Sequence, residues 1–455
     1  MSFSSLSFLF AFLPLVLILY YLSPAPRWRN GVLLCASLLF YAWGAPKALP
    51  LLVGTALLVW LCGLGMEKGL RWCCPLSVAF VLGSLLLFKY LGFFAGLFGA
   101  RLSISLLLPA GISFTTFQLL AYLLDLRRGE IQAERSFFRF LLFVCFFPQL
   151  LQGPILRYGK TAPMLGARAV AWDGAVCGMR RFLRGLAKKV LIADQAAVLA
   201  AAVYGSSEYV GTDALWLAAL CYTLQIYFDF SGYSDMAIGL GQLFGFSLPE
   251  NFNYPYTALS ITDFWRRWHI TLSLWFRDYV YIPLGGNRVG RGRFVLNILT
   301  VWALTGLWHG ASWNFVLWGL YYGVLLLIEK LVIGKRIERV PPVLRWAVTF
   351  TLVNLGWVMF NISDPQTLLW TLKNMFVYAP TDWRGLLALD ASICSKALAL
   401  PFALLFSFPV AKRWAMREEG FARTASINAG YFALLVVCVL FIISSSFTPF
   451  IYFNF

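Results

Sequence analysis

The stretch VLNILTVWALTGLWHGASWNFVLWGLYYGVLLLI (residues 295–328) consists of two apolar runs, residues 295–308 and 313–328, that meet at the break WHGASWN. Runs of this kind indicate helices that cross the roughly 30 Å hydrocarbon core of a bilayer. The break places His309 at or within the bilayer. Burying a titratable group there is costly unless it faces a cavity, so we expect a cavity or a substrate path around this imidazole.

The composition of the whole chain indicates the same class of protein. Of its 455 residues, 60% are hydrophobic and 13% are charged, which favours an all-α polytopic membrane protein over two or three soluble domains. Residues 140–151 are too short to span comfortably and end in FPQLLQGPILRY (residues 147–158), which predicts a re-entrant segment. We expect about ten to twelve membrane-embedded segments in all. Further candidate runs lie at residues 6–22, 31–43, 49–64, 75–98, 106–126, 215–230, 236–246, 346–360, 397–408 and 431–443.

Charge and cysteine content exclude several functions. The net charge of +17 indicates cytoplasmic loops that face anionic headgroups, and no nucleic-acid-binding motif accompanies it. The nine cysteines lie mostly in or beside apolar runs and form no CxxC pair, so we expect them to be buried rather than to form disulfides or hold a metal. The sequence contains none of the motifs HExxH, GxxxxGKS/T and GxSxG, which mark zinc proteases, P-loop NTPases and serine hydrolases, so these three enzyme classes are disfavoured.

A basic and aromatic helix is predicted at residues 263–279, DFWRRWHITLSLWFRDY. On a helical wheel its tryptophans, including Trp268, share one face, and Arg266 and Arg267 lie on another. Such a helix is expected to lie along the membrane surface, with its arginines at the phosphates of membrane lipids or of a soluble anionic ligand. His269 falls at the edge of the apolar face, where an interfacial histidine with a structural role is an equal alternative.

Charged residues next to apolar runs are the next candidates. The motif DFSGYSD places Asp229, Ser231 and Asp235 beside predicted spans, where acids are functional candidates by default. The alternative is that these acids hold arginines or lysines from the basic loops. Lys89, in the middle of residues 75–98, is expected to reach the interface with its ammonium group.

His309 is suited to acid–base chemistry. An imidazole of ordinary pKa near 6.5, kept neutral by desolvation, can take the proton from a hydroxyl that attacks an acyl carbonyl. Ser312 or Asn314 is expected to cap the helix after the break. A buried histidine that merely bridges two helices is the alternative.

Seven segments resemble the membrane-bound O-acyltransferase family, specifically its alginate O-acetyltransferase-like bacterial branch. They run in family order from residue 108 to the end of the chain. Six of them are LPAGISFTTFQLLAYLLDLRRG (108–129), FPQLLQGPILRY (147–158), QIYFDFSGYSDMAIG (225–239), NFNYPY (251–256), DFWRRWHITLSLWFRDYVYIPLGGNR (263–288) and GLWHGASWNFVLWGLYYG (306–323), and the seventh is the aromatic C-terminus. The resemblance implies one membrane domain over residues 1–455 with helices around a central tunnel. Residues 1–107 match only in hydrophobic character, and residues 108–455 form the core, with the catalytic stretch at 263–323.

The resemblance also implies a reaction. It makes His309 the catalytic histidine and His269 the second motif histidine. An acyl-CoA, here acetyl-CoA, would be the cytoplasmic donor, with no permanently bound cofactor. The acyl-donor path is expected to include Arg266, Arg267, Trp268 and Asn314, and the supporting residues to be Asp229, Ser231, Asp235 and Gln152.

Location, partner and acceptor follow from the same resemblance. It implies a bacterial cytoplasmic (inner) membrane, a periplasmic SGNH-type acetyltransferase partner and an alginate-like exopolysaccharide as acceptor. Peptidoglycan, cellulose or teichoic acid acylation stays open, the last with a carrier protein as donor in the D-alanylation branch. A non-enzymatic transporter or channel gated at His309 is a further alternative.

Overall fold

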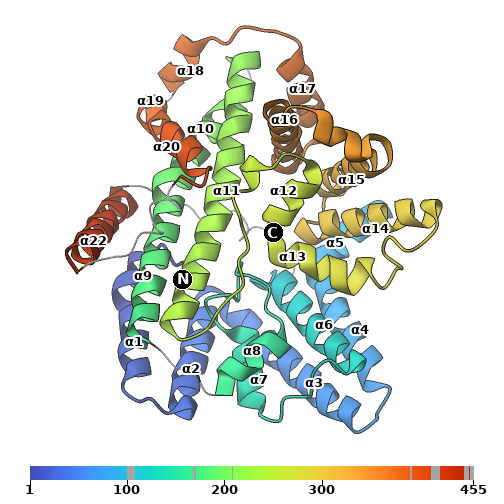
Figure 1. Cartoon of the computed structure of the whole chain (residues 1–455), viewed down its shortest axis with the longest axis vertical. Helices are drawn as coiled ribbons and strands as arrows, with labels where there is room; N and C mark the ends of the chain where they lie inside the picture. The colour runs from blue at the N-terminus through green and yellow to red at the C-terminus, as the bar shows by residue number, and fades with distance from the viewer. Residues whose placement is uncertain are drawn as a thin grey trace. The chain divides into compact units, whose positions relative to one another are not determined.

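The computed structural model describes residues 1–99, 108–166, 168, 171–206, 209–389, 392–410, 421–444 and 450. Every regular element in these ranges is helical, as predicted (Figure 1). The chain divides into two compact units. The first consists mainly of Met1–Arg184 and Tyr233–Glu250, and the second of Gly185–Gly232 and Asn251–Ile451. Most of the aromatic C-terminus, which belongs to the resemblance, lies outside the described residues.

Five described helical segments are long and apolar enough to cross a membrane. These are Pro46–Glu67, Cys73–Leu97, Trp313–Arg339, Pro342–Asn361 and Thr424–Ser444. Each coincides with a predicted apolar run, because length and hydropathy alone identify such helices. The chain is therefore a multi-pass membrane protein.

The first unit begins with a bundle of apolar helices. In chain order its elements are η1 (Phe8–Phe12), α1 (Leu13–Tyr21), α2 (Pro26–Gly44), η2 (Pro46–Ala48), α3 (Leu49–Glu67), α4 (Cys73–Leu85), η3 (Leu86–Tyr90), α5 (Leu91–Leu97), α6 (Ile112–Arg128), α7 (Phe137–Cys145) and α8 (Tyr158–Gly166). Two helices run through both units, α9 (Trp172–Ala187) and α11 (Thr212–Leu243).

The predicted re-entrant segment, residues 140–151, begins within α7 and continues as irregular, buried backbone. After α7 ends at Cys145, the chain forms turns and extended backbone until α8 begins at Tyr158. The Gln149 side chain donates to the Gln118 side chain at 3.2 Å, and Gln118 donates to the Phe143 carbonyl at 2.7 Å. Irregular backbone at membrane depth needs such internal partners, as the proline-rich sequence predicted.

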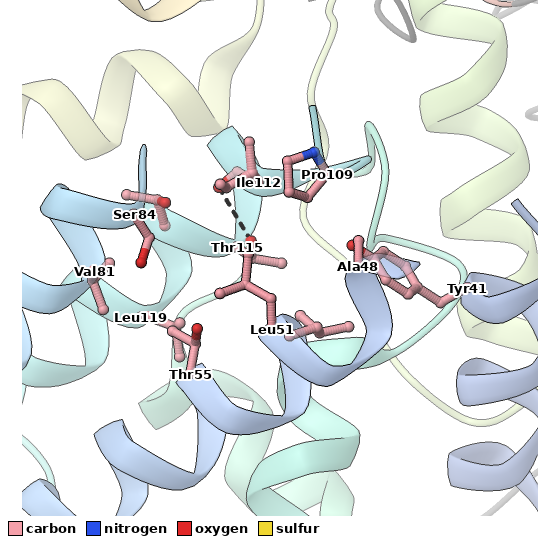
Figure 2. Close-up of a pocket in the computed structure, with 12 residues that line it drawn as sticks. Tyr41, Ala48, Leu51, Thr55, Val81, Ser84, Pro109, Ile112, Thr115 and Leu119 are labelled. Carbon is pink, nitrogen blue, oxygen red and sulfur yellow. Dashed lines mark hydrogen bonds between the residues drawn. The ribbon is translucent and has the colours of Figure 1, made fainter. Parts of the chain in front are cut away.

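A cavity lies among α3, α4 and α6 of the first unit (Figure 2). Its volume is about 30 Å³, which is room for about two water molecules. Its lining mixes leucines with the hydroxyl side chains of Tyr41, Thr55, Ser84, Thr115 and Thr116.

Lys89 does not behave as predicted. Its ammonium group donates to the Ser113 hydroxyl of α6 at 3.0 Å, so it turns toward a neighbouring helix instead of reaching along its own helix to the interface. A polar partner within reach makes this the less costly arrangement for a charge in an apolar helix.

The second unit contains the central stretch. Besides parts of α9 and α11, its elements are η4 (Lys188–Ala193), α10 (Asp194–Tyr204), η5 (Pro255–Thr257), α12 (Ile261–Arg267), α13 (Ile270–Phe276), η6 (Arg277–Tyr281), α14 (Arg291–His309), α15 (Trp313–Leu327), η7 (Ile328–Ile333), η8 (Gly334–Arg339), α16 (Pro342–Asn361), α17 (Pro365–Phe376), α18 (Trp383–Leu389), α19 (Ser392–Ala397), α20 (Ala399–Phe406) and α22 (Phe421–Ser444).

Helices α14 and α15 follow each other as a hairpin (Figure 1), and glycines lie where the two helices meet. A Cβ atom added at Gly306 would lie 2.2 Å from the Phe315 carbonyl oxygen, and one added at Gly319 would lie 2.2 Å from that of Trp302. The two backbones therefore approach as closely as glycine allows, which is typical of helix pairs in membranes.

The prediction of two spans around DFSGYSD is wrong, and the prediction that the cysteines are buried holds for most of them. Residues 215–230 and 236–246 are not separate spans, because α11 continues through DFSGYSD without a break. Gly232 permits this continuity at a crowded point, since a Cβ there would lie 2.8 Å from the Gly185 carbonyl oxygen. Six of the nine cysteines are buried, but Cys35, Cys177 and Cys394 are exposed on the surface of the chain.

Candidate active site

His309 is the last residue of α14, at the turn of the glycine-packed hairpin. Its side chain is 3% exposed. The imidazole meets the ring of Trp318 edge-on at 5.0 Å and that of Phe360 at 5.2 Å. The turn is tight, since a Cβ added at Gly310 would lie 2.2 Å from the Phe315 ring. The predicted position of His309, buried between two apolar runs, is confirmed.

His269 lies at a break that the sequence did not predict. Residues 263–279 do not form one helix, because α12 ends at Arg267 and α13 begins at Ile270. Between them His269 adopts a left-handed backbone conformation (φ 44°, ψ 54°), which is uncommon for a residue other than glycine. The break rotates the two halves relative to each other, so a wheel drawn through both does not describe a single face.

The prediction that His269 lies at the membrane surface is also wrong. Its side chain is 1% exposed and lies inside the protein. The ring meets Phe230 of α11 edge-on at 4.7 Å and Trp308 of α14 at 5.8 Å. Burial lowers the pKa of the imidazole to about 3, so the ring is neutral at physiological pH.

Trp308 connects the two histidines. Its indole ring lies 5.8 Å from the ring of His269 and 4.9 Å from that of His309, measured between centroids. Two segments that are 40 residues apart in the chain thus place their imidazoles against one aromatic side chain. The structure therefore brings the two predicted histidines into one buried site of the second unit.

The other aromatic side chains of α12 and its surroundings form the wall of this site. Trp268 is 1% exposed and lies 4.7 Å from the Trp357 ring, and Trp265 lies 5.6 Å from Trp318. The prediction that this Trp-rich face lies along the membrane surface is therefore wrong, since these rings pack against protein. Aromatic packing of this kind excludes water and fixes ring positions.

The arginines of α12 differ in their surroundings. Arg266 is exposed, whereas Arg267 pairs with Asp263 one turn earlier, at 2.8 Å between Nε and Oδ1. The N-terminus of α12 is bound by Glu329 of η7, whose carboxylate accepts the Ile261 amide at 2.8 Å and the Thr262 amide at 3.2 Å. Carboxylates stabilise helix N-termini in this way.

Asn314 does not cap α15 as predicted. Ser312 is the N-cap residue but makes no side-chain capping bond. Asn314 is 4% exposed, and its amide donates to the Phe360 carbonyl at 3.2 Å. Its role is to join the start of α15 to the end of α16, beside the ring that contacts His309.

Asp229 and Ser231 belong to a buried charge cluster. The Lys189 ammonium lies 2.6 Å from an Asp229 carboxylate oxygen and 2.8 Å from one of Asp194. Ser231 accepts a longer bond of 3.4 Å from Lys188. The alternative that the acids hold basic residues is confirmed for Asp229, which is 1% exposed beside a lysine that is 2% exposed.

Asp235 and Gln152 lie in the first unit. Arg181 binds Asp235 at 2.9 Å and Glu250 at 2.5 Å, so the pairing alternative is confirmed for Asp235 as well. Gln152 is fully buried in the irregular segment, and among the described residues neither atom of its side-chain amide has a hydrogen-bond partner. Because Arg181 and Lys189 are neutralised by carboxylates, they are poor ligands for a phosphate group.

Sequence reasoning missed three polar residues that bind the predicted ones. Asn251 and Glu329 bind backbone and side chain around α12 and His269, and Asp194 completes the Lys189 cluster. Asn251 occurs in the quoted NFNYPY segment, where an asparagine before a proline-bearing turn could have drawn notice. Across the part of the chain that the structure describes, no group of three His, Cys, Asp or Glu side chains could hold a metal ion.

Comparison with known proteins identifies the family. Residues 133–362 match the membrane-bound O-acyltransferase family. The chain is 43% identical over 402 residues to the probable alginate O-acetylase AlgI of Azotobacter vinelandii, covering 84% of this chain and 79% of that protein. It is 37% identical over 412 residues to the peptidoglycan O-acetyltransferase of Helicobacter pylori, covering 81% and 78%. Over 277 residues it is 28% identical to the teichoic acid D-alanyltransferase of Bacillus subtilis, covering 55% and 68%. The chain belongs to the membrane-bound O-acyltransferase family and is an O-acyltransferase of the membrane.

Proposed function

We propose that this enzyme transfers acetyl groups from cytoplasmic acetyl-CoA towards the hydroxyls of an alginate-like exopolysaccharide. The observation that carries this proposal is the 43% identity to a probable alginate O-acetylase over 84% of the chain, which includes both histidines of the buried site. The lower identity to the teichoic acid D-alanyltransferase disfavours a carrier-bound D-alanyl donor.

In the proposed reaction His309 is the general base. An acceptor hydroxyl attacks the thioester carbonyl of acetyl-CoA while His309 takes its proton. The tetrahedral intermediate then expels the CoA thiolate, which receives that proton back from the imidazolium, so the products are the acetyl ester and CoA-SH. The aromatic rings of Trp318 and Phe360 pack against the imidazole. A general base must be in its neutral form before the reaction.

The donor end of the path is proposed at α12. Arg266 is the exposed arginine there and is available to a CoA phosphate, whereas Arg267 is engaged with Asp263. Trp268 and Asn314 act indirectly, since the first supports the aromatic wall and the second positions the Phe360 backbone. Arginine is well suited to phosphate because its planar group donates several hydrogen bonds at once.

Location and partner complete the proposal. The net charge of +17 supports a cytoplasmic membrane with basic loops on the inner side. An acceptor polymer outside that membrane would need a second protein to receive the acetyl group, for which a periplasmic SGNH-type acetyltransferase is proposed. The relative from Helicobacter pylori makes peptidoglycan the second candidate acceptor.

The test uses labelled acetyl-CoA with membranes that contain the full-length enzyme and its partner. His309→Gln keeps hydrogen-bonding capacity without a basic nitrogen, so label transfer to polymer should fall about 10²–10⁴-fold. Cys177→Ser, at an exposed position of α9, is the matched control and should transfer label at the normal rate. Undiminished transfer by a well-folded His309→Gln enzyme contradicts the mechanism, whereas a transporter gated at His309 would release no labelled ester at all.

A further inference from the structure

Asn251 is fully buried and lies against His269. Its side-chain oxygen Oδ1 lies 3.2 Å from Nδ1 of the imidazole. The same oxygen accepts the backbone N–H of Thr271 at 3.2 Å and the Thr271 hydroxyl at 2.9 Å. Three groups therefore converge on one amide oxygen.

These contacts determine where the imidazole proton sits. A backbone N–H can only donate, so the Asn251 atom that faces Thr271 must be the oxygen and not the amide nitrogen. An amide oxygen can only accept, so Nδ1 of His269 must carry a hydrogen. A neutral imidazole has one N–H, which leaves Nε2 as the atom with the lone pair.

The backbone around Asn251 holds the ring in place. The Asn251 carbonyl accepts the amide of Ile270 at 3.0 Å, and the amide of Asn253 donates to the Arg267 carbonyl at 2.9 Å. These two bonds join the segment that begins at Asn251 to the chain on both sides of His269, the residue with the left-handed backbone conformation. Such a conformation is strained for a residue other than glycine and persists where its surroundings over-determine it, often at functional sites.

The surroundings also keep the ring uncharged. Phe230 and Trp308 meet the imidazole ring at steep angles, and neither carries a charge. Burial lowers the pKa of His269 to about 3, so the tautomer fixed by Asn251 stays neutral across physiological pH.

We propose that Asn251 is a positioning residue, which holds His269 as the Nδ1–H tautomer so that its Nε2 accepts a hydrogen bond from a substrate O–H or N–H. This division of labour rests on the proposed function, in which His309 takes the proton. His269 binds and orients a donor group without becoming an imidazolium. Its role is therefore distinct from that of a second general base.

The tautomer can be observed directly, because the chain has only two histidines. In full-length enzyme labelled with ¹⁵N-histidine and reconstituted in lipid, the ring signals of His269 are assigned by their persistence in His309→Gln. We expect a protonated Nδ1 and a bare Nε2 from pH 5 to pH 8. A protonated Nε2, or an imidazolium at pH 6, overturns the proposal. This readout does not depend on turnover, so it separates the present inference from the assignment of His309.

Variants of Asn251 test the positioning role. Asn251→Asp keeps the acceptor, so the Nδ1–H tautomer should persist, but its carboxylate stabilises the imidazolium and should introduce an acidic limb in the pH–rate profile. Asn251→Leu removes the acceptor, and Nε2–H should appear with a loss of about tenfold or more in kcat. Thr271→Val removes one donor to the same oxygen and should leave the tautomer unchanged, which provides a folded control. If Asn251→Leu fails to fold, the Asn251→Asp profile decides, and a profile identical to that of the unmodified enzyme refutes the role.

Discussion

Adding one methyl group at Gly306 should misplace the proposed base. A Cβ there would lie 2.2 Å from the Phe315 carbonyl oxygen, whereas nine in ten real contacts of a Cβ are longer than 3.4 Å. The obstacle is backbone and cannot rotate away, so α14 and α15 must separate by about 1 Å. His309 lies one turn further along α14 and moves with the helix.

The expected effects of Gly306→Ala follow from this displacement. Overpacking should lower the free energy of unfolding by about 1–3 kcal/mol. A shift of about 1 Å in a catalytic group should lower kcat about 100-fold with a much smaller change in KM. Thermal unfolding of the purified enzyme and initial rates of acetyl transfer in reconstituted vesicles measure the two effects.

Gly292→Ala is the matched control on the same helix. A Cβ at Gly292 would meet nothing within 4 Å, so this change should leave the rate unaltered. Because Gly292 lies in the first turn of α14, the gain in stability should be at most about 0.5 kcal/mol. A Gly306→Ala enzyme with normal kcat and normal stability refutes the close packing of the hairpin. Normal stability with reduced kcat would instead support geometry as the limiting factor.

Three further outcomes are expected. Lys189→Met removes the cation that binds the buried Asp229 and the half-buried Asp194 and should cost about 3–5 kcal/mol of stability. Asp194→Asn keeps the ion pair between Lys189 and Asp229 and should be nearly neutral, as thermal unfolding would show. Arg266→Gln should raise KM for acetyl-CoA about tenfold and weaken its salt dependence, and Arg267→Gln should change KM less because that arginine already binds a carboxylate; equal effects contradict the assignment. Because the pKa of His269 is lowered to about 3 in the folded state, its contribution to stability is complete above pH 6.5 and declines as pH falls toward 3; the loss at pH 5 should be about 2 kcal/mol and should vanish in His269→Gln.

The membrane helices could be predicted because their signal is local. The run at residues 49–64 lies within α3, and its length and hydropathy determine that result whatever it packs against. The pairing of Asp229 and Asp235 with basic residues was foreseeable on the same terms, since a carboxylate in an apolar environment needs a cation. Neither partner could be named, because the choice depends on which helices meet.

The break at His269 could not be predicted, because its cause is not local. No proline or glycine lies between Asp263 and Tyr279, so the local signals favour a continuous helix. The competing interaction comes from Asn251, 18 residues earlier, whose carbonyl and side chain replace the missing helical bonds. Conversely, DFSGYSD looked like a break between spans, but α11 continues through it because Lys189 satisfies the buried acid. The prediction of a single membrane domain stays a prediction.

The bond from Glu329 to the start of α12 has a mechanical consequence. Glu329 follows the C-terminal end of α15, so this bond holds the start of α12 against that end. Trp265, in the middle of α12, packs against Trp318 and Tyr322 of α15. Because α12 is held to α15 at two points, it cannot rotate away from α15 to open the site. His269 and His309 should therefore travel as one rigid body, and any motion that admits a substrate must be hinged outside the piece that joins them.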